Sequence, residues 1–123
     1  MAKRQNDLDR GVARMLELAG EVDDVAFTVS RGVTRPVWEP DRGTLAIYGK
    51  ARAIASSMGF DLPHGSAGGG SDGNFTGALG IATLDGLGAS GSGYHTLEEH
   101  IEIDSLVTRG RLMAGLLATL DGS

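Results

Sequence analysis

The amino-acid sequence predicts a small α/β protein in which helices alternate with short extended segments. Apolar residues recur at three- and four-residue spacing, and β-branched or continuously apolar runs lie between them. Half of the 20 glycines lie between Gly68 and Gly93, which indicates turns with positive φ or a backbone that comes close to a ligand. The expected order is α-β, a proline-containing hinge, and then α-β-turn-α-β-turn-α, as in α/β units.

The first segment is predicted to form a helix that is followed by a strand. Asn6 or Asp7 is placed to cap the helix, and Gly20 is placed to end it. The run VAFTVS at 25–30 is β-branched and aromatic, which favours a strand. The apolar side of the helix would consist of Leu8, Val12, Met15, Leu16 and Ala19.

A proline-containing connector follows the strand. In Thr34–Pro40 the residue before each proline is driven out of helical space, so the segment is expected to be extended. It carries Trp38, the single tryptophan, for which packing at the hinge is the expected role. We place a candidate domain boundary here, so that residues 1–40 and 41–123 form the two parts of the chain.

Two further helices are predicted after the hinge. One opens at Gly43-Thr44 and ends at Gly59, a residue type that is common just after a helix C-terminus. The other is short, spans 74–79 and ends at Gly80. The longer helix would turn inward the side chains of Leu45, Tyr48, Ala51, Ala55 and Met58, with Ile47 and Ile54 beside them.

The remaining chain is predicted to contain one buried strand and a C-terminal helix. The run 81–84 is apolar without polar alternation, which is typical of a strand covered on both faces. Thr96 would cap a brief turn that carries Glu98 and Glu99, and Asp104 would cap the last helix. The apolar stripe of that helix would be Leu106, Met113, Leu117 and Leu120, with Val107 and Leu116 beside it.

Composition places the chain among soluble globular proteins. It has 123 residues, a formal net charge of −5 and 41% hydrophobic residues, which is ordinary for a folded domain. There is no basic patch that would attract nucleic acid, and no apolar run long enough to span a membrane. Cysteine is absent, so disulfides and thiolate metal ligands are excluded. We therefore expect a cytoplasmic protein without nucleic-acid or membrane partners, and the absence of cysteine is also compatible with a periplasm.

The loop Gly68–Asn74 is the first candidate site. Consecutive small residues expose backbone N–H groups that can hold a carboxylate or a phosphate, and Gly69, Gly70 and Ser71 stand at the centre of this loop. No Gly-Lys-Ser/Thr follows, so the phosphate-loop pattern is absent. A tight strand-to-helix turn explains the same residues as well.

Two side chains are further candidates. Arg35, on the stiff connector, has a planar guanidinium that can bind a carboxylate with two hydrogen bonds, and an exposed linker arginine is the alternative. His95 ends the second glycine-rich turn and is a candidate metal ligand, although a lone histidine is more often structural or exposed. His64 and His100 have weaker contexts and are expected at the surface.

Three motifs follow one another along the chain, and they read GGGSDGNF at 68–75, GIATLDGLG at 80–88 and GYHTLEEHIEI at 93–103. In this order they resemble the C-terminal segment of a family of zinc-dependent metallopeptidases. The family includes carboxypeptidase G, acetylornithine deacetylase, succinyl-diaminopimelate desuccinylase and aminoacylase, and the chain most resembles its glutamate carboxypeptidase-like branch. The resemblance implies that residues 1–40 are the last helix and strand of an α+β lid (dimerisation) domain with its hinge. Residues 41–123 would be the C-terminal part of the catalytic α/β domain.

The resemblance also implies a role for each candidate residue. His95 would be the last protein ligand of a two-zinc centre, in which cobalt or manganese can stand in for zinc. Arg35 and the loop residues Gly69, Gly70 and Ser71 would bind the carboxylate of a small peptide or N-acyl amino acid substrate. Asn74 lies in the same motif and would at most support these residues. The intact protein would be a homodimeric carboxypeptidase or amidohydrolase (deacylase) that cleaves an amide bond to a glutamate-type amino acid.

The chain departs from the family in its length. Members are several times longer, and their other zinc ligands and general-base glutamate come from an N-terminal catalytic segment with His-x-Asp and Glu-Glu motifs. No His-x-Asp occurs here, and the only Glu-Glu pair follows His95. The expectation is therefore a C-terminal fragment that lacks a catalytic base and is inactive alone. Two alternatives stay open, namely a non-catalytic truncated interaction module and an anion-binding α/β domain unrelated to hydrolases.

Overall fold

The computed structural model describes residues 2–120 and contains both helices and strands. The chain divides into two compact units, of which the first comprises Met1–Pro40 with Ser66–Ile81 and the second Asp41–Gly65 with Ala82–Ser123. Within these residues, four strands pair into two separate two-stranded antiparallel sheets. The predicted mixture of helix and strand is confirmed, whereas a sheet covered on both faces is absent from the described residues.

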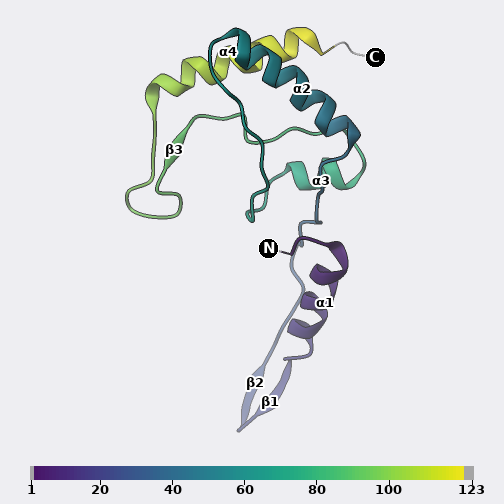
Figure 1. The fold of residues 1–123 in the computed structure, drawn as a ribbon. Helices are drawn as coiled ribbons and strands as arrows, with labels where there is room; N and C mark the ends of the chain where they lie inside the picture. Colours follow the sequence, from purple (N-terminus) through teal and green to yellow (C-terminus); the bar gives the residue numbers. More distant parts are fainter. Residues whose placement is uncertain (1, 121–123) are drawn as a thin grey trace. The chain divides into compact units, whose positions relative to one another are not determined.

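Two long helices form the body of the second unit. Helix α2 spans Arg42–Ser57 and helix α4 spans Ile103–Thr119, and the two pack against each other (Figure 1). At the start of α2 the backbone N–H of Thr44 donates to the carboxylate of Asp41, with 2.7 Å between nitrogen and oxygen. This side-chain cap satisfies one of the N–H groups that a helix start leaves unpaired. The predicted start near Gly43 is confirmed to within the usual uncertainty of helix ends.

Helix α2 ends in a Schellman motif. Gly59 has a φ of 84°, a left-handed conformation that glycine adopts without steric cost. The N–H of Phe60 then bonds to the carbonyl of Ala55, and the N–H of Gly59 bonds to the carbonyl of Ser56, both at 3.1 Å. The prediction that Gly59 ends this helix is therefore confirmed.

The hydrophobic core lies between α2 and α4. Its largest fully buried side chain is Leu112 of α4, and the hydroxyl of Tyr48 on α2 closes one side by donating to the carbonyl of Leu62 at 2.8 Å. Small residues let the two helices approach closely, because a Cβ on Gly115 would lie 3.1 Å from Cγ2 of Ile54. The buried apolar residues are Ala51, Ala55, Leu62, Leu112 and Leu116.

The predicted buried face of α4 is wrong. Leu112 and Leu116 are buried, of which Leu116 was expected beside the stripe. The stripe itself is exposed, namely Leu106, Met113, Leu117 and Leu120. Apolar residues occur around much of this helix, so periodicity alone does not select a side. The side with Gly115 faces α2, because a missing Cβ there leaves room for Ile54. On α2, the predicted inward residue Leu45 is likewise 51% exposed.

The start of α4 also differs from the prediction. Asp104 lies in the first turn, where the helix dipole stabilises its negative charge. Glu102 occupies the cap position, and its side chain makes no capping hydrogen bond. The hydroxyl of Ser105 connects this start to the preceding loop. It donates to the carbonyl of Glu102 at 2.6 Å and accepts from the N–H of Ser90 at 2.9 Å.

A short hairpin precedes α4 in the second unit. Strand β3 (Gly91–Ser92) pairs antiparallel with β4 (His100–Ile101). The predicted turn at Thr96 lies between them, because Oγ1 of Thr96 donates to the carbonyl of Gly93 at 2.7 Å and accepts from the N–H of Glu98 at 3.2 Å. The turn is confirmed, whereas strands of two residues carry no periodic signal and were not predicted.

The first unit contains a second hairpin. Strand β1 (Gly20–Val22) pairs with β2 (Val25–Phe27), and Asp23 and Asp24 form the turn with φ of 50° and 62°. Positive φ at both turn residues matches the twist that two-residue hairpins prefer. The strand predicted at 25–30 is therefore shorter than expected, and its partner β1 was not predicted.

Helix α1 of the first unit spans Gln5–Leu16, so neither of its predicted ends is correct. Asn6 and Asp7 lie inside the helix, and Gly20 starts β1 instead of ending α1. Side-chain pairs three and four residues apart stabilise the first turns of the helix, which begins before the predicted start. Arg10 bonds to Asp7 at 2.7 Å, and Gln5 bonds to Asp9 at 2.9 Å.

Helix α3 (Gly73–Ala78) also belongs to the first unit and ends as α2 does. Gly80 has a φ of 75°, its N–H bonds to the carbonyl of Gly77 at 3.0 Å, and the N–H of Ile81 bonds to the carbonyl of Thr76 at 3.2 Å. The predicted short helix and its end at Gly80 are confirmed. The predicted buried strand at 81–84 is wrong, because Ile81 is 55% exposed and its N–H closes the helix instead of pairing with a strand.

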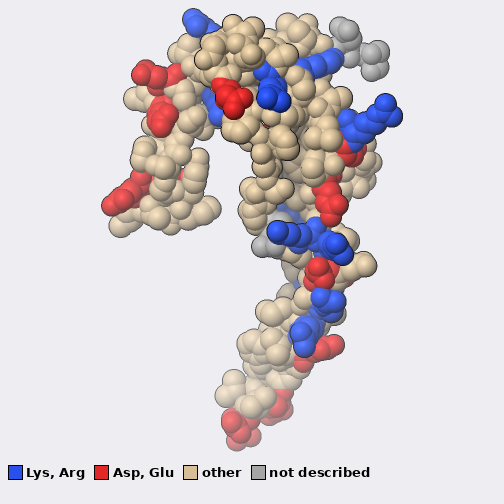
Figure 2. Space-filling view, in the orientation of Figure 1, with Lys and Arg blue, Asp and Glu red and all other residues tan. Residues whose placement is uncertain are grey.

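No described helix is long and apolar enough to cross a lipid bilayer. On the face drawn in Figure 2, Lys and Arg side chains alternate with Asp and Glu side chains over α1, and acidic groups gather at the turn of the β1–β2 hairpin.

Candidate functional site

The connector that carries Arg35 runs beside the end of the glycine loop within the first unit. Nη2 of Arg35 lies 3.5 Å from Oδ1 of Asp72, the residue after Ser71. The guanidinium also lies over the ring of Phe75, 5.8 Å from its centre. Two predicted parts of the carboxylate site, separated by more than thirty positions in the sequence, thus belong to one compact unit.

The glycine loop itself is exposed and leaves space for a ligand. Gly69 and Gly70 are exposed, and a Cβ on Gly69 would meet no atom within 4 Å. Within residues 2–120 the N–H groups of these two glycines donate no hydrogen bond. The N–H of Ser71 is already used, because it donates to Oδ1 of Asn74 at 2.9 Å. The donors that the loop offers to an anion are therefore the two glycine N–H groups and the hydroxyl of Ser71.

Asn74 connects this loop to the connector. Its Nδ2 donates to the carbonyl of Pro36 at 2.9 Å, while its Oδ1 accepts from Ser71. Only 8% of the residue is exposed. Trp38, further along the connector, packs against Gly77 so closely that a Cβ on that glycine would overlap the indole ring. The packing role expected for Trp38 thus has a defined partner.

His95 lies in the loop between β3 and β4 of the second unit. Its side chain is exposed, and its φ of 63° is unusual for a residue with a Cβ. The surrounding loop is held by the Thr96 bonds and by a hydrogen bond from Tyr94 Oη to the carbonyl of Gly91 at 3.2 Å. The arrangement presents the imidazole at the end of a short hairpin.

The described residues do not make a metal site by themselves. Among them, no three histidine, aspartate or glutamate side chains come together in a group that fits a metal ion. A metal centre needs about three protein ligands, and His95 is a single exposed donor.

Two histidines that were expected at the surface are exposed and make contacts. His64 packs edge-on against Tyr48, with 4.7 Å between ring centres. His100 lies within hydrogen-bond distance of Ser92 Oγ, at 3.2 Å from Nε2, and of the carbonyl of Glu98, at 2.8 Å from Nδ1. Sequence reasoning missed the pair of Ser92 and His100, as well as Asp72 beside Arg35. The Ser-Asp-Gly motif was the available signal for Asp72, whereas the pairing across β3 and β4 had none.

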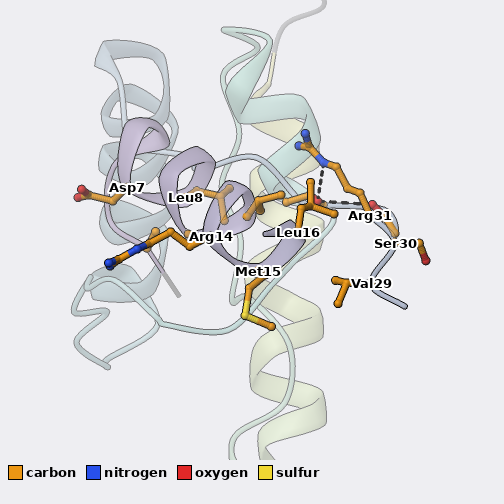
Figure 3. A pocket seen from close by; sticks show the side chains of 13 residues that line it. Asp7, Leu8, Arg14, Met15, Leu16, Val29, Ser30 and Arg31 are labelled. Carbon is orange, nitrogen blue, oxygen red and sulfur yellow. Dashed lines mark hydrogen bonds between the residues drawn. The ribbon is translucent and has the colours of Figure 1, made fainter. Parts of the chain in front are cut away.

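An open hollow of about 650 Å³ lies elsewhere in the first unit, between α1 and the segment 29–34 (Figure 3). Leu8 and Leu16 line its α1 side, and Val29 and Arg31 line the other. Arg31 is fixed there by a hydrogen bond to Thr34 Oγ1 at 3.3 Å. None of the predicted site residues lines this hollow. It is an uncovered apolar face of α1, a helix in which no residue is buried.

Comparison with known proteins defines the class of this chain. The model of peptidase family M20/M25/M40 matches residues 11–119, so the chain belongs to this family. Members of the family are hydrolases that are generally metal-dependent, typically on zinc. The resemblance seen in the three motifs is therefore confirmed at the level of the family.

A similar curated protein is the succinyl-diaminopimelate desuccinylase of Thioalkalivibrio sulfidiphilus (strain HL-EbGR7). It is 35% identical over 68 residues, which make up 55% of this chain and 18% of that relative. This chain therefore matches less than a fifth of the relative's length. No solved structure matches the chain. The glutamate carboxypeptidase-like branch has no support from these comparisons.

Proposed function

We propose that this chain supplies the substrate-carboxylate site of a metal-dependent hydrolase that cleaves an amide bond to an amino acid. The observation that carries the proposal is the position of Arg35, whose guanidinium lies against the end of the glycine loop in the same compact unit. Membership of a peptidase family and similarity to a desuccinylase support a substrate with a free carboxylate.

The chemistry of these residues suits a carboxylate. Guanidinium is planar and donates two parallel N–H groups, and a charge-assisted hydrogen bond of this kind contributes about 1.5–3 kcal/mol. In this proposal the substrate carboxylate takes the place of Asp72 beside Arg35 and accepts further bonds from Gly69, Gly70 and Ser71. The exposed Asp72 side chain would turn into water.

The metal part of the proposal rests on the family. We propose His95 as one ligand of a metal centre of zinc, cobalt or manganese, with two ions in the intact protein. The remaining donors and the general base would come from parts of the whole protein outside this chain, which alone would be inactive. In the same proposal residues 1–40 end a lid that also forms a homodimer, and residues 41–123 belong to the catalytic domain.

A second candidate function is metal-free binding of a carboxylate or phosphate by a non-catalytic module. The observation that favours it is the absence of a converging metal-donor group among the described residues. Both candidate functions use Arg35 and the glycine loop to bind an anion. They differ in whether the function requires metal ions.

Titration of the chain with L-glutamate, followed by Trp38 fluorescence and by calorimetry, tests the proposal. We expect binding by the unmodified chain and a loss of about tenfold or more in affinity for Arg35→Ala. Arg31→Ala is the matched control, because Arg31 is an exposed arginine shortly before the connector, and its Nε donates to Thr34 Oγ1 at 3.3 Å. Equal glutamate affinity of the Arg35→Ala variant and the unmodified chain would refute the carboxylate site. Tight binding of inorganic phosphate in place of glutamate would favour the second candidate.

A further inference from the structure

Asn74 occupies an unusual position in the first unit. In the described part of that unit it is the one buried residue, with 8% of its surface exposed. A buried amide destabilises a fold unless its donor and acceptor are both satisfied. Here both ends have partners at 2.9 Å, the carbonyl of Pro36 and the N–H of Ser71. These partners belong to the two segments of the proposed carboxylate site.

We propose that Asn74 is a positioning residue that holds Arg35 beside the glycine loop. Pro36 directly follows Arg35, and a residue before proline has a restricted backbone. Fixing the carbonyl of Pro36 therefore fixes the direction in which the Arg35 side chain leaves the connector. The inference rests on the proposed function, because it assigns to Asn74 the alignment of the groups that bind the carboxylate.

The amide of asparagine is suited to this task. It carries a donor and an acceptor at opposite positions of one short, rigid group. Aspartate would keep the acceptor for Ser71 and lose the donor for Pro36, and leucine of similar size would lose both. The bond to Asn74 occupies the Ser71 N–H, and the Ser71 hydroxyl oxygen accepts from the Gly73 N–H at 3.1 Å, so the hydroxyl proton is the donor that Ser71 can offer to the ligand.

Trp38 provides a spectroscopic reporter of the same arrangement. It lies two residues after Pro36, packs on Gly77 of α3 and is the single tryptophan of the chain. If the Asn74 bonds are lost, the connector separates from the loop and the indole becomes more accessible to water. Acrylamide quenching of Trp38 fluorescence thus measures the positioning without any ligand.

The test combines Asn74→Leu with Arg35→Ala in a double-mutant cycle, with L-glutamate as the probe. We expect Asn74→Leu to weaken glutamate binding about fivefold or more, with increased quenching of Trp38. In the Arg35→Ala background the same change should have no further effect, because Asn74 acts through Arg35. An equal loss in both backgrounds, or unchanged affinity and quenching in a folded Asn74→Leu chain, would overturn the proposal. Asn6→Ala, an exposed asparagine of α1 in the same unit, is the control.

A second variant covers the case in which Asn74→Leu does not fold. The pair Asn74→Asp with Asp72→Asn keeps the net charge and the bond to Ser71, and it removes the bond to Pro36. It should bind glutamate more weakly than Asp72→Asn alone, and equal affinity would contradict the proposal. If the unmodified chain binds no glutamate, the proposed function fails. The quenching of Trp38 in the Asn74 variants still decides whether Asn74 holds the connector.

Discussion

The guanidinium of Arg35 pairs with Asp72 and lies over the ring of Phe75, and the ion pair is weak. Its ion pair with Asp72 is 3.5 Å long, and the Asp72 side chain is 95% exposed. An exposed pair of this kind contributes about 0–1 kcal/mol to stability. In the proposed site, a carboxylate ligand that makes two parallel bonds to Arg35 would displace the weakly held Asp72 side chain.

Replacing Asp72 by asparagine should therefore strengthen carboxylate binding. We expect affinity for L-glutamate to rise about two- to fivefold, and stability to change by less than about 0.5 kcal/mol. Trp38 fluorescence titration and urea unfolding measure the two effects. Asp61→Asn, the same charge change at an exposed residue of the second unit, is the control. Weaker glutamate binding by Asp72→Asn would mean that Asp72 helps to form the site.

In an intact protein that contains this chain, Arg35→Ala should act on substrate binding alone. We expect KM to rise about 10- to 150-fold, the equivalent of one charge-assisted pair, with the metal content unchanged. Metal analysis by mass spectrometry together with steady-state kinetics measures both quantities. His95→Ala should show the reverse pattern, with loss of metal. An unchanged KM for Arg35→Ala would exclude the assigned role.

At the scale of elements, two glycines of α4 make a matched pair. A Cβ on Gly110 would meet nothing within 4 Å, whereas a Cβ on Gly115 would lie 3.1 Å from Cγ2 of Ile54. Alanine favours a helix over glycine by up to about 1 kcal/mol, and overpacking a helix contact costs about 1–3 kcal/mol. Gly110→Ala should therefore stabilise the chain and Gly115→Ala should not. Urea unfolding monitored by circular dichroism should separate the two variants by about 1–2 kcal/mol, and equal stability would show that α2 yields to the added methyl group.

The cap of α2 predicts a dependence of stability on pH. The hydrogen bond from the Thr44 backbone N–H lowers the pKa of Asp41 below its ordinary value of 3.8, and burial opposes this only weakly. A carboxyl group whose pKa is lower in the folded state than in the unfolded state stabilises the folded state at pH values above its unfolded-state pKa. This contribution is lost as pH falls through the folded pKa, below about 3.8.

Asp41→Asn isolates this effect, because asparagine also caps helices and does not titrate. The difference in unfolding free energy between the unmodified chain and this variant should be constant from pH 5 to 7 and should change in acid, in favour of the variant. Urea unfolding at a series of pH values measures it, with Asp61→Asn as the reference carboxylate. If the difference in unfolding free energy between the two chains did not change at acid pH, the Asp41 cap would not cause the pH dependence of stability.

Signals contained in one or two residues were readable from the sequence, and signals that need a distant partner were not. Gly59 and Gly80 end helices because a glycine just after the last helical turn adopts the left-handed conformation that closes a Schellman motif. The buried side of α4 depends on its contact with α2, so periodicity placed Leu116 only beside the predicted stripe and missed Leu112. The two hairpins have strands of two or three residues, which cannot show alternation.

The candidate site likewise contains features that the sequence indicates and contacts that only the folded chain shows. Motif resemblance indicated Arg35, the glycine loop and His95, and their roles remain proposals. No spacing rule connects Arg35 with Asp72, or Pro36 with Asn74, because these contacts join segments more than thirty residues apart. Asn74 was placed in the motif without a partner, and only the folded backbone provides its two bonds.

For the whole chain, burial is distributed unequally between the two units. All buried apolar residues of the described chain belong to the second unit, while the buried residue of the first unit is Asn74. Helix α1 and strands β1 and β2 contain no buried residue. Since apolar burial is the main source of stability, the second unit should hold its structure more firmly than the first.

Hydrogen exchange followed by mass spectrometry tests this difference directly. Amides of α2 and α4 should exchange slowest, and those of α1, β1 and β2 should exchange close to the rate of an unfolded peptide. Leu112→Ala should destabilise the second unit by about 2–5 kcal/mol and speed exchange in α2 and α4, because Leu112 is fully buried between them. Exchange in α1 should stay unchanged. Strong protection of α1 in the unmodified chain would mean that its apolar face, which lines the open hollow, is covered by a second molecule in solution.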